Sequence, residues 1–98
     1  MIKEKTYIHN DEYYYQIIRQ NIKRFRLEKG LTQQDLADMT DLSREYICDI
    51  ENESRNKHLT IAVLGRIADA MNIHIVNFFV TDKLTDKKRK IERSKNKQ

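Results

Sequence analysis

Residues 32–51 read TQQDLADMTDLSREYICDIE and contain two short helical patterns with a turn between them. Thr32 and Asp35 stand three residues apart, in the arrangement of a capping box that begins a helix. Asp41 falls at the turn, where an aspartate tolerates left-handed backbone better than most residues. Ser43 is a good N-cap for the helix that follows. We therefore expect two helices joined by about three residues.

Apolar residues at helical spacing predict further helices on both sides of this stretch. A first helix is expected to end near Gly30, with inward positions at Tyr14, Ile18, Ile22 and Phe25. In the central pair the inward positions are Leu36, Ala37, Met39, Leu42, Ile47 and Ile50. Thr60 is the expected N-cap of a fourth helix, with inward positions at Leu64, Ile67, Ala68 and Met71. A short fifth helix is expected over Ile73, Ile75, Phe78 and Phe79. The prediction is an all-α, compact five-helix bundle.

The composition agrees with a small helical domain. The 98 residues include no proline and two glycines, which favours helices over a turn-rich β fold. No apolar run is long enough for a membrane span, and no signal peptide is recognised. Cys48 is the single cysteine, so no internal disulfide can form. We expect a reduced, cytoplasmic protein with no membrane association.

Charge divides the chain unevenly. Residues 82–98 hold eight Lys or Arg against three Asp or Glu, whereas residues 1–81 hold eleven against twelve. The net charge of +4 is therefore +5 on the last segment and −1 on the rest. We expect an N-terminal arm over residues 1–12, a folded domain over 13–81 and a basic C-terminal extension over 82–98. Attraction to a polyanion must then come from local placement in the domain or from the extension.

The spacing within residues 32–51 is that of a helix-turn-helix, whose second helix enters the DNA major groove. The string IKRFRLEKGLTQQDLADMTDLSREYICDIEN, residues 22–52, resembles the phage-repressor and Cro-like (Xre-type) helix-turn-helix family. The resemblance continues more loosely through LGRIADAMNIHIVNFF, residues 64–79. Within that family, RLEKGLTQQDLA and SREYICDIENESRN also resemble the controller proteins of restriction–modification systems. The resemblance implies a five-helix fold and sequence-specific operator binding, commonly as a homodimer.

Two positions and one loop depart from the family pattern. The family often has glycine at the turn and again two residues after the glutamate of the third helix, where this chain has Asp41 and Glu53. The loop before the fourth helix is also a residue or two longer. These departures bear on the contacts made by residues 53–58 more than on the fold.

The polar run at the start of the third helix is where the resemblance predicts base contacts. Arg44 can donate to guanine O6 and N7 together, and Glu45 can accept from cytosine N4. Tyr46 can pack on a thymine methyl or reach a phosphate, and Asp49 lies one turn further along. A solvated helix face of mixed charge would explain the same run. Asp49 could instead bond Arg44 or a loop residue.

Other polar residues are predicted to position the protein on the DNA backbone. Ser43 and Gln33 lie at helix N-termini, where backbone N–H groups suit a phosphate. A polar loop is expected over residues 52–58, and it contributes Ser54, Arg55, Asn56 and Lys57. Such contacts fix register without reading sequence, and the alternative is a polar surface loop. The resemblance also implies a structural ion pair between Arg26 and Glu51, which would orient the third helix.

The leading hypothesis is a repressor-like transcriptional regulator that binds double-stranded DNA, with a recognition helix at about residues 43–52. A homodimer would bind a roughly palindromic operator with half-sites about one helical turn apart. Residues 73–79 are the candidate dimer surface, although the same residues could close the core. One alternative is a protein-interaction module on the same fold, such as an antitoxin or a regulator's partner. Another is binding of nucleic acid or anionic membrane through residues 82–98 alone.

Enzymatic and metal-binding roles find no support in the sequence. The histidines His9, His58 and His74 are scattered, and Cys48 has no cysteine partner, so no metal-ligand spacing is present. Ser43 has no histidine at a recognisable triad spacing. We expect no enzyme activity, no metal and no cofactor.

Overall fold

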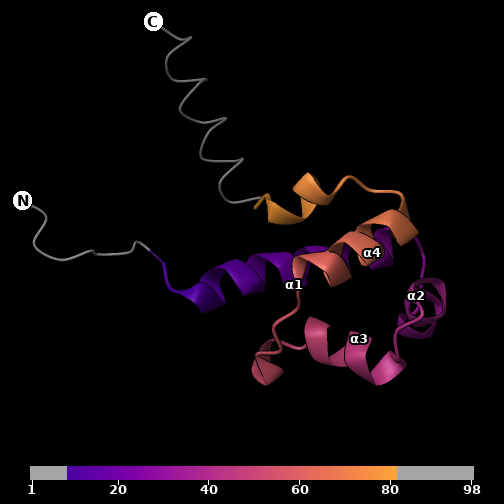
Figure 1. The fold of residues 1–98 in the computed structure, drawn as a ribbon, viewed down its shortest axis with the longest axis horizontal. Helices are drawn as coiled ribbons and strands as arrows, with labels where there is room; N and C mark the ends of the chain where they lie inside the picture. The colour runs from indigo at the N-terminus through magenta and orange to yellow at the C-terminus, as the bar shows by residue number, and fades with distance from the viewer. Residues whose placement is uncertain (1–8, 82–98) are drawn as a thin grey trace, which may run out of the picture.

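The computed structural model describes residues 9–81 as a helical bundle (Figure 1). Its α-helices are α1 (Asp11–Glu28), α2 (Gln33–Thr40), α3 (Arg44–Glu51) and α4 (Ile61–Met71). Two short 3₁₀-helices are η1 (Glu53–Arg55) and η2 (Ile75–Phe79). Within residues 9–81 there is no strand, as the all-α prediction requires. The predicted basic extension, 82–98, and most of the predicted arm lie outside the described residues.

The fifth predicted element is η2, a 3₁₀-helix and not an α-helix. The loop predicted over residues 52–58 also contains a helical turn, η1. The first α-helix begins at Asp11, so the last two residues of the predicted arm are helical. Its N-cap is Asn10, whose Oδ1 accepts a hydrogen bond from the backbone N–H of Tyr13 at 3.0 Å.

Capping and a left-handed residue build the turn between α2 and α3. The Thr32 hydroxyl accepts from the Asp35 N–H at 2.9 Å, and the Asp35 carboxylate accepts from the Thr32 N–H at 2.9 Å. These two bonds complete the predicted capping box. Asp41 ends α2 in the left-handed region, with φ 60° and ψ 34°. The N–H of Leu42 then donates to the carbonyl of Ala37 at 3.1 Å, which closes the turn.

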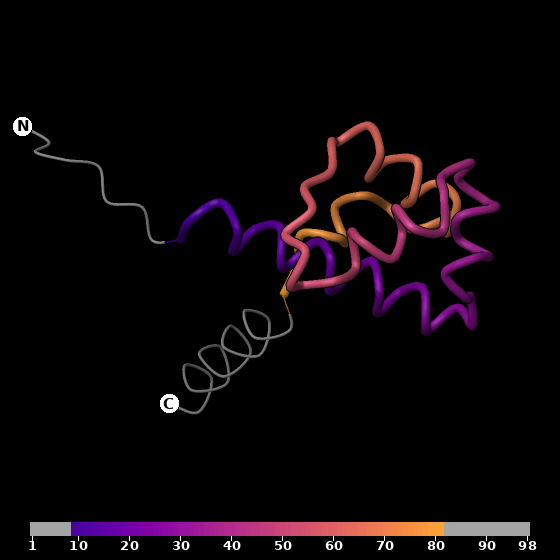
Figure 2. Tube along the Cα trace, turned by 90° about the horizontal axis from the view of Figure 1, so that it is seen from below, coloured from indigo at the N-terminus to yellow at the C-terminus, as the bar shows by residue number. Residues whose placement is uncertain are grey.

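The core lies where α1 meets α3, α4 and η2 and where α2 packs on α3 and α4. The views in Figures 1 and 2 show the first turns of α1 extending past the rest of the bundle. The buried apolar side chains of the core are Ile18, Ile22, Leu36, Ala37, Ile47, Ile50, Leu59, Leu64, Ile67, Ala68, Met71 and Phe78. The Phe78 ring meets Phe25 edge to face, with the ring centroids 5.0 Å apart. Aromatic packing thus fixes η2 against α1.

Three predicted inward positions are wrong. Tyr14, Met39 and Phe79 are 53%, 48% and 45% exposed. The neighbouring Tyr15 is the tyrosine that packs, because its ring stacks on His58 with the centroids 3.9 Å apart. In η2 the tighter 3₁₀ turn directs Phe78 inward and leaves Phe79 at the surface.

Candidate nucleic-acid interface

The N-terminal turn of α3 presents the predicted base-contacting residues. The Ser43 hydroxyl caps the helix by accepting a hydrogen bond from the Tyr46 N–H at 3.0 Å. Arg44 and Glu45 follow directly, and both are exposed. A short capped helix therefore carries a guanidinium and a carboxylate into solvent at its first turn. Those groups have the donor and acceptor chemistry that distinguishes base edges in a major groove.

Tyr46 and Asp49 are less free than Arg44. Tyr46 is half-buried against the core, and this burial raises the pKa of its hydroxyl. The Lys57 ammonium lies over the Tyr46 ring, 5.5 Å from its centroid. Asp49 faces Arg55, with 3.8 Å between Oδ1 and Nη1. Of the alternatives considered for Asp49, contact with a loop residue is thus present as an ion pair. Both contacts bring the loop alongside α3.

The loop itself folds around two asparagines. The Asn52 Oδ1 accepts from the Ser54 N–H at 3.0 Å and from the Ser54 hydroxyl at 2.7 Å. Asn56 is left-handed, with φ 51°, and ends η1. With its amide nitrogen turned toward α1, Asn56 donates to Glu12 Oε2 at 3.1 Å. Ser54, Arg55, Asn56 and Lys57 are all exposed, so the predicted backbone-contacting side chains of the loop reach solvent.

A buried ion pair fixes the C-terminal end of α3. Arg26 Nε lies 2.8 Å from Glu51 Oε2 and Arg26 Nη2 lies 2.9 Å from Glu51 Oε1, a two-pronged pair. The side chains are 7% and 3% exposed. The hydrogen bond to Glu51 raises the pKa of Arg26. Gln33 Nε2 also donates to Glu51 Oε1 at 3.2 Å, so the first residue of α2 joins the pair instead of pointing into solvent.

Arg19 is a buried residue that sequence reasoning missed. It is 1% exposed, and its guanidinium reaches the Ile50 carbonyl at 3.1 Å, the Lys57 carbonyl at 3.2 Å and Glu12 Oε2 at 2.9 Å. A signal was available in the spacing. Glu12, Arg19 and Arg26 are each seven residues apart, so they lie on one face of α1, two turns from each other. That face meets α3 and the loop.

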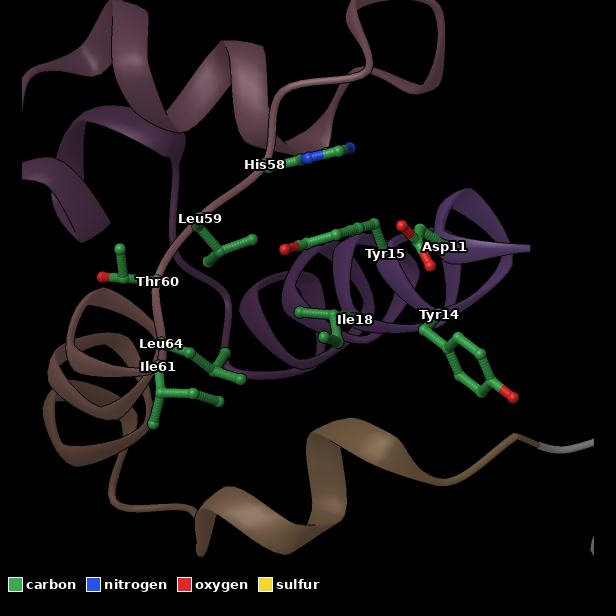
Figure 3. Close-up of a pocket in the computed structure, with 9 residues that line it drawn as sticks. All are labelled: Asp11, Tyr14, Tyr15, Ile18, His58, Leu59, Thr60, Ile61 and Leu64. Atoms are coloured by element: carbon green, nitrogen blue, oxygen red, sulfur yellow. The ribbon is translucent and has the colours of Figure 1, made fainter. Parts of the chain in front are cut away.

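The described residues offer little for metal or membrane chemistry. Between residues 9 and 81 no group of three or more His, Cys, Asp and Glu side chains could hold a metal ion. Within the same residues no helix combines the length and apolar character of a membrane span. An open groove of about 600 Å³ lies between α1, the end of the loop before α4 and the start of α4. Figure 3 shows its lining, which is largely aromatic and aliphatic.

Comparison with known proteins places this geometry in a family. The helix-turn-helix family model matches residues 22–78, more than half of the chain. The chain belongs to the helix-turn-helix family. It is 40% identical over 58 residues to an immunity repressor protein of Bacillus phage phi105, covering 59% of this chain and 39% of the phage protein. This chain therefore matches well under half of that repressor's length.

Restriction–modification controllers are also similar to this member of the helix-turn-helix family. The control protein C.SmaI of Serratia marcescens is 32% identical over 60 residues, which cover 61% of this chain and 69% of C.SmaI. The controller protein C.Esp1396I, solved bound to a 25 base pair operator site, matches with a TM-score of 0.61 and 39% identity. That match covers 67% of this chain and 84% of the controller. Both resemblances identified in the sequence are confirmed.

Proposed function

We propose that this protein is a sequence-specific, DNA-binding transcription regulator of the repressor type. The observation that carries the proposal is the build of α3. Its N-terminal turn exposes Arg44 and Glu45, while its C-terminal end is fixed to α1 by the Arg26–Glu51 pair. The operator-bound structure of C.Esp1396I, 39% identical, supports DNA as the partner. No enzymatic role is needed to explain these residues.

In this proposal α3 enters the major groove and the loop follows the phosphate backbone. Arg44 pairs with guanine and Glu45 accepts from cytosine N4. Tyr46, half-buried and with the Lys57 ammonium over its ring, packs on a thymine methyl or reaches a phosphate. Asp49 acts through its contact with Arg55 and not as an independent reader of bases. Positioning contacts come from Ser43, Gln33, Ser54, Arg55, Asn56 and Lys57, with Asn56 and Gln33 contributing their backbone N–H groups.

The proposed regulator acts as a homodimer on a roughly palindromic operator. Val76, Phe79 and Val80 are exposed apolar residues on and just after η2, and they are the proposed dimer surface. A second copy would cover them and set two recognition helices about one helical turn of DNA apart. Sedimentation at micromolar concentration tests this point. A monomeric protein would contradict the proposed homodimer and, with it, the proposed palindromic operator.

Selection from a random duplex library near physiological salt tests the proposed function. We expect an enriched palindromic sequence, because base contacts add discrimination to the salt-dependent backbone term. Absence of enrichment would contradict the proposal. Binding that is steeply salt-dependent and lost on removal of residues 82–98 would assign nucleic-acid binding to that segment instead. Capture of a protein partner whose binding is unchanged by Arg44→Ala would support the interaction-module alternative.

A further inference from the structure

The first turns of α1 contact the loop between α3 and α4 through residues that precede the family-matched segment, residues 22–78. Glu12 Oε1 lies 3.1 Å from His58 Nε2, and Glu12 Oε2 accepts from Arg19 at 2.9 Å. The Tyr15 and His58 rings stack with their planes 3° apart (Figure 3). The hydrogen bond from His58 is the main cause of a lowered pKa of Glu12. The loop is therefore joined to α1 by a side-chain hydrogen bond and by ring stacking.

Arg19 connects this contact to the recognition helix. Its Nη1 donates to both the Ile50 carbonyl, in the last turn of α3, and the Lys57 carbonyl, in the loop. Carbonyls in the last turn of a helix lack partners within the helix and form the negative end of its dipole. A buried guanidinium is suited to that position because it supplies several donors and a fixed positive charge. Arg19 therefore caps α3 and fixes the loop with the same nitrogen.

Both attachment points lie near the end of the loop that joins α3 to α4. Lys57 and His58 end the loop just before Leu59 enters the core. A loop that is not held in place has many conformations to lose when it contacts DNA. The contacts from α1 remove that freedom in advance, which is a general way to gain affinity.

We propose that Arg19 and Glu12 are positioning residues for DNA binding. They hold residues 53–58, and thus the exposed side chains of Ser54, Arg55 and Lys57, in the arrangement that contacts the phosphate backbone. The inference rests on the proposed function. It adds that residues 11–19, although they precede the matched helix-turn-helix segment, are part of the DNA-binding apparatus without touching DNA.

The sharpest test compares Glu12→Ala with Asp11→Ala in the full chain. Both variants remove one acidic group from the first turn of α1, so their effects on net charge and on the helix dipole match. Electrostatics alone would tighten DNA binding by both variants, since each removes a charge that repels phosphate. We expect Glu12→Ala to bind the selected operator roughly three- to tenfold more weakly than Asp11→Ala. Its slope of log K against log salt should also be shallower by about one, for one lost phosphate contact.

Hydrogen exchange of the amides in residues 53–58 provides a readout without DNA. We expect Glu12→Ala to lose protection there while its melting transition stays cooperative. Arg19→Met should have a larger effect on the same amides, and Arg19→Lys should restore only part of it, because one ammonium replaces a three-way guanidinium. If Arg19→Met fails to fold, Glu12→Ala still decides the question.

Two results would overturn the proposal. One is equal loop protection, affinity and salt slope in Glu12→Ala and Asp11→Ala. The other is a loosened loop with unchanged affinity and slope. Failure of the unaltered protein to select any operator is a separate outcome. It would remove the proposed function and the DNA-positioning role together, and the exchange data would still report whether α1 holds the loop.

Discussion

The two ends of α3 differ in almost every physical respect. At its N-terminal turn, Arg44 and Glu45 are exposed, the Ser43 hydroxyl caps the helix and Tyr46 is half-buried. At its C-terminal end, Ile50 and Glu51 are buried and joined to α1 by Arg19 and Arg26. One helix of eight residues thus has a free end and a fixed end.

The difference shows how a very small domain can present side chains accurately. An isolated helix of this length is unstable in water, so its geometry must come from packing and from its termini. Arg19 and Arg26 both contact the C-terminal end of α3. The exposed side chains at its N-terminal end are therefore not needed to hold the helix in place. Residues on a helix that is packed against the rest of the domain are positioned more precisely than residues on a mobile loop.

The largest expected effect comes from breaking the fixed end. Arg26→Met should lower the free energy of unfolding by about 3–5 kcal/mol, because Glu51 is left as a buried, unpaired charge. The double variant Arg26→Met/Glu51→Leu should recover most of that loss. Urea unfolding of the two variants measures the difference. Equal stability of the single and double variants would show that leaving Glu51 unpaired does not destabilise the fold.

Changing the free end should weaken binding and leave folding intact. Arg44→Ala is expected to cost about 1–3 kcal/mol in binding to the selected operator, which is roughly 5- to 150-fold in Kd. Its free energy of unfolding should stay within about 0.5 kcal/mol of the unaltered protein, as for most surface substitutions. Fluorescence anisotropy and urea unfolding provide the two measurements. Arg24→Ala, at a half-buried arginine on α1 that pairs with Glu28, is the control for loss of one positive charge.

The turn between the helices offers a smaller change of opposite sign. Asp41 has φ 60°, a conformation that costs an L-residue energy and costs glycine almost none. Asp41→Gly should therefore raise the free energy of unfolding by up to about 1 kcal/mol. Chemical denaturation of this variant beside Asp41→Ala tests the sign. A less stable Asp41→Gly would mean that the aspartate side chain contributes more than its backbone strain removes.

Low pH should destabilise the start of α2, where the Asp35 carboxylate completes the capping box. The hydrogen bond from the Thr32 backbone lowers the pKa of Asp35 below its ordinary 3.8. A lowered pKa contributes stability that is fully present above the ordinary value and is lost as the pH falls through the folded one. The urea concentration at the midpoint of unfolding should therefore decrease as the pH is lowered below about 3.8. Asp35→Asn should show a shallower fall in that range, and an unchanged acid profile would exclude the contribution.

Local features of the fold could be predicted from the sequence. The caps Thr32, Ser43 and Thr60 each accept a backbone hydrogen bond, and Asp41 is left-handed as expected. These features depend on residues within one turn of each other, and short-range sequence patterns describe them well. The helix-turn-helix itself followed from such signals together with the family resemblance.

Features that depend on distant partners could not be predicted in the same way. Tyr15 packs in place of Tyr14 because His58, more than forty residues later, provides its partner. Arg19 was missed because its acceptors belong to residues 50 and 57. The Tyr46 ring is half-buried and Asp49 faces Arg55 for the same reason. Apolar periodicity identifies a buried face but does not indicate which polar groups will meet there.

The most direct single measurement compares Arg44→Ala with Arg55→Ala on two duplexes, the selected operator and a scrambled sequence of the same composition. If the free end of α3 reads bases and the loop contacts phosphates, Arg44→Ala should reduce the ratio of the two affinities by roughly 5-fold or more. Arg55→Ala should weaken binding to both duplexes about equally. A ratio unchanged by Arg44→Ala would contradict base reading by α3.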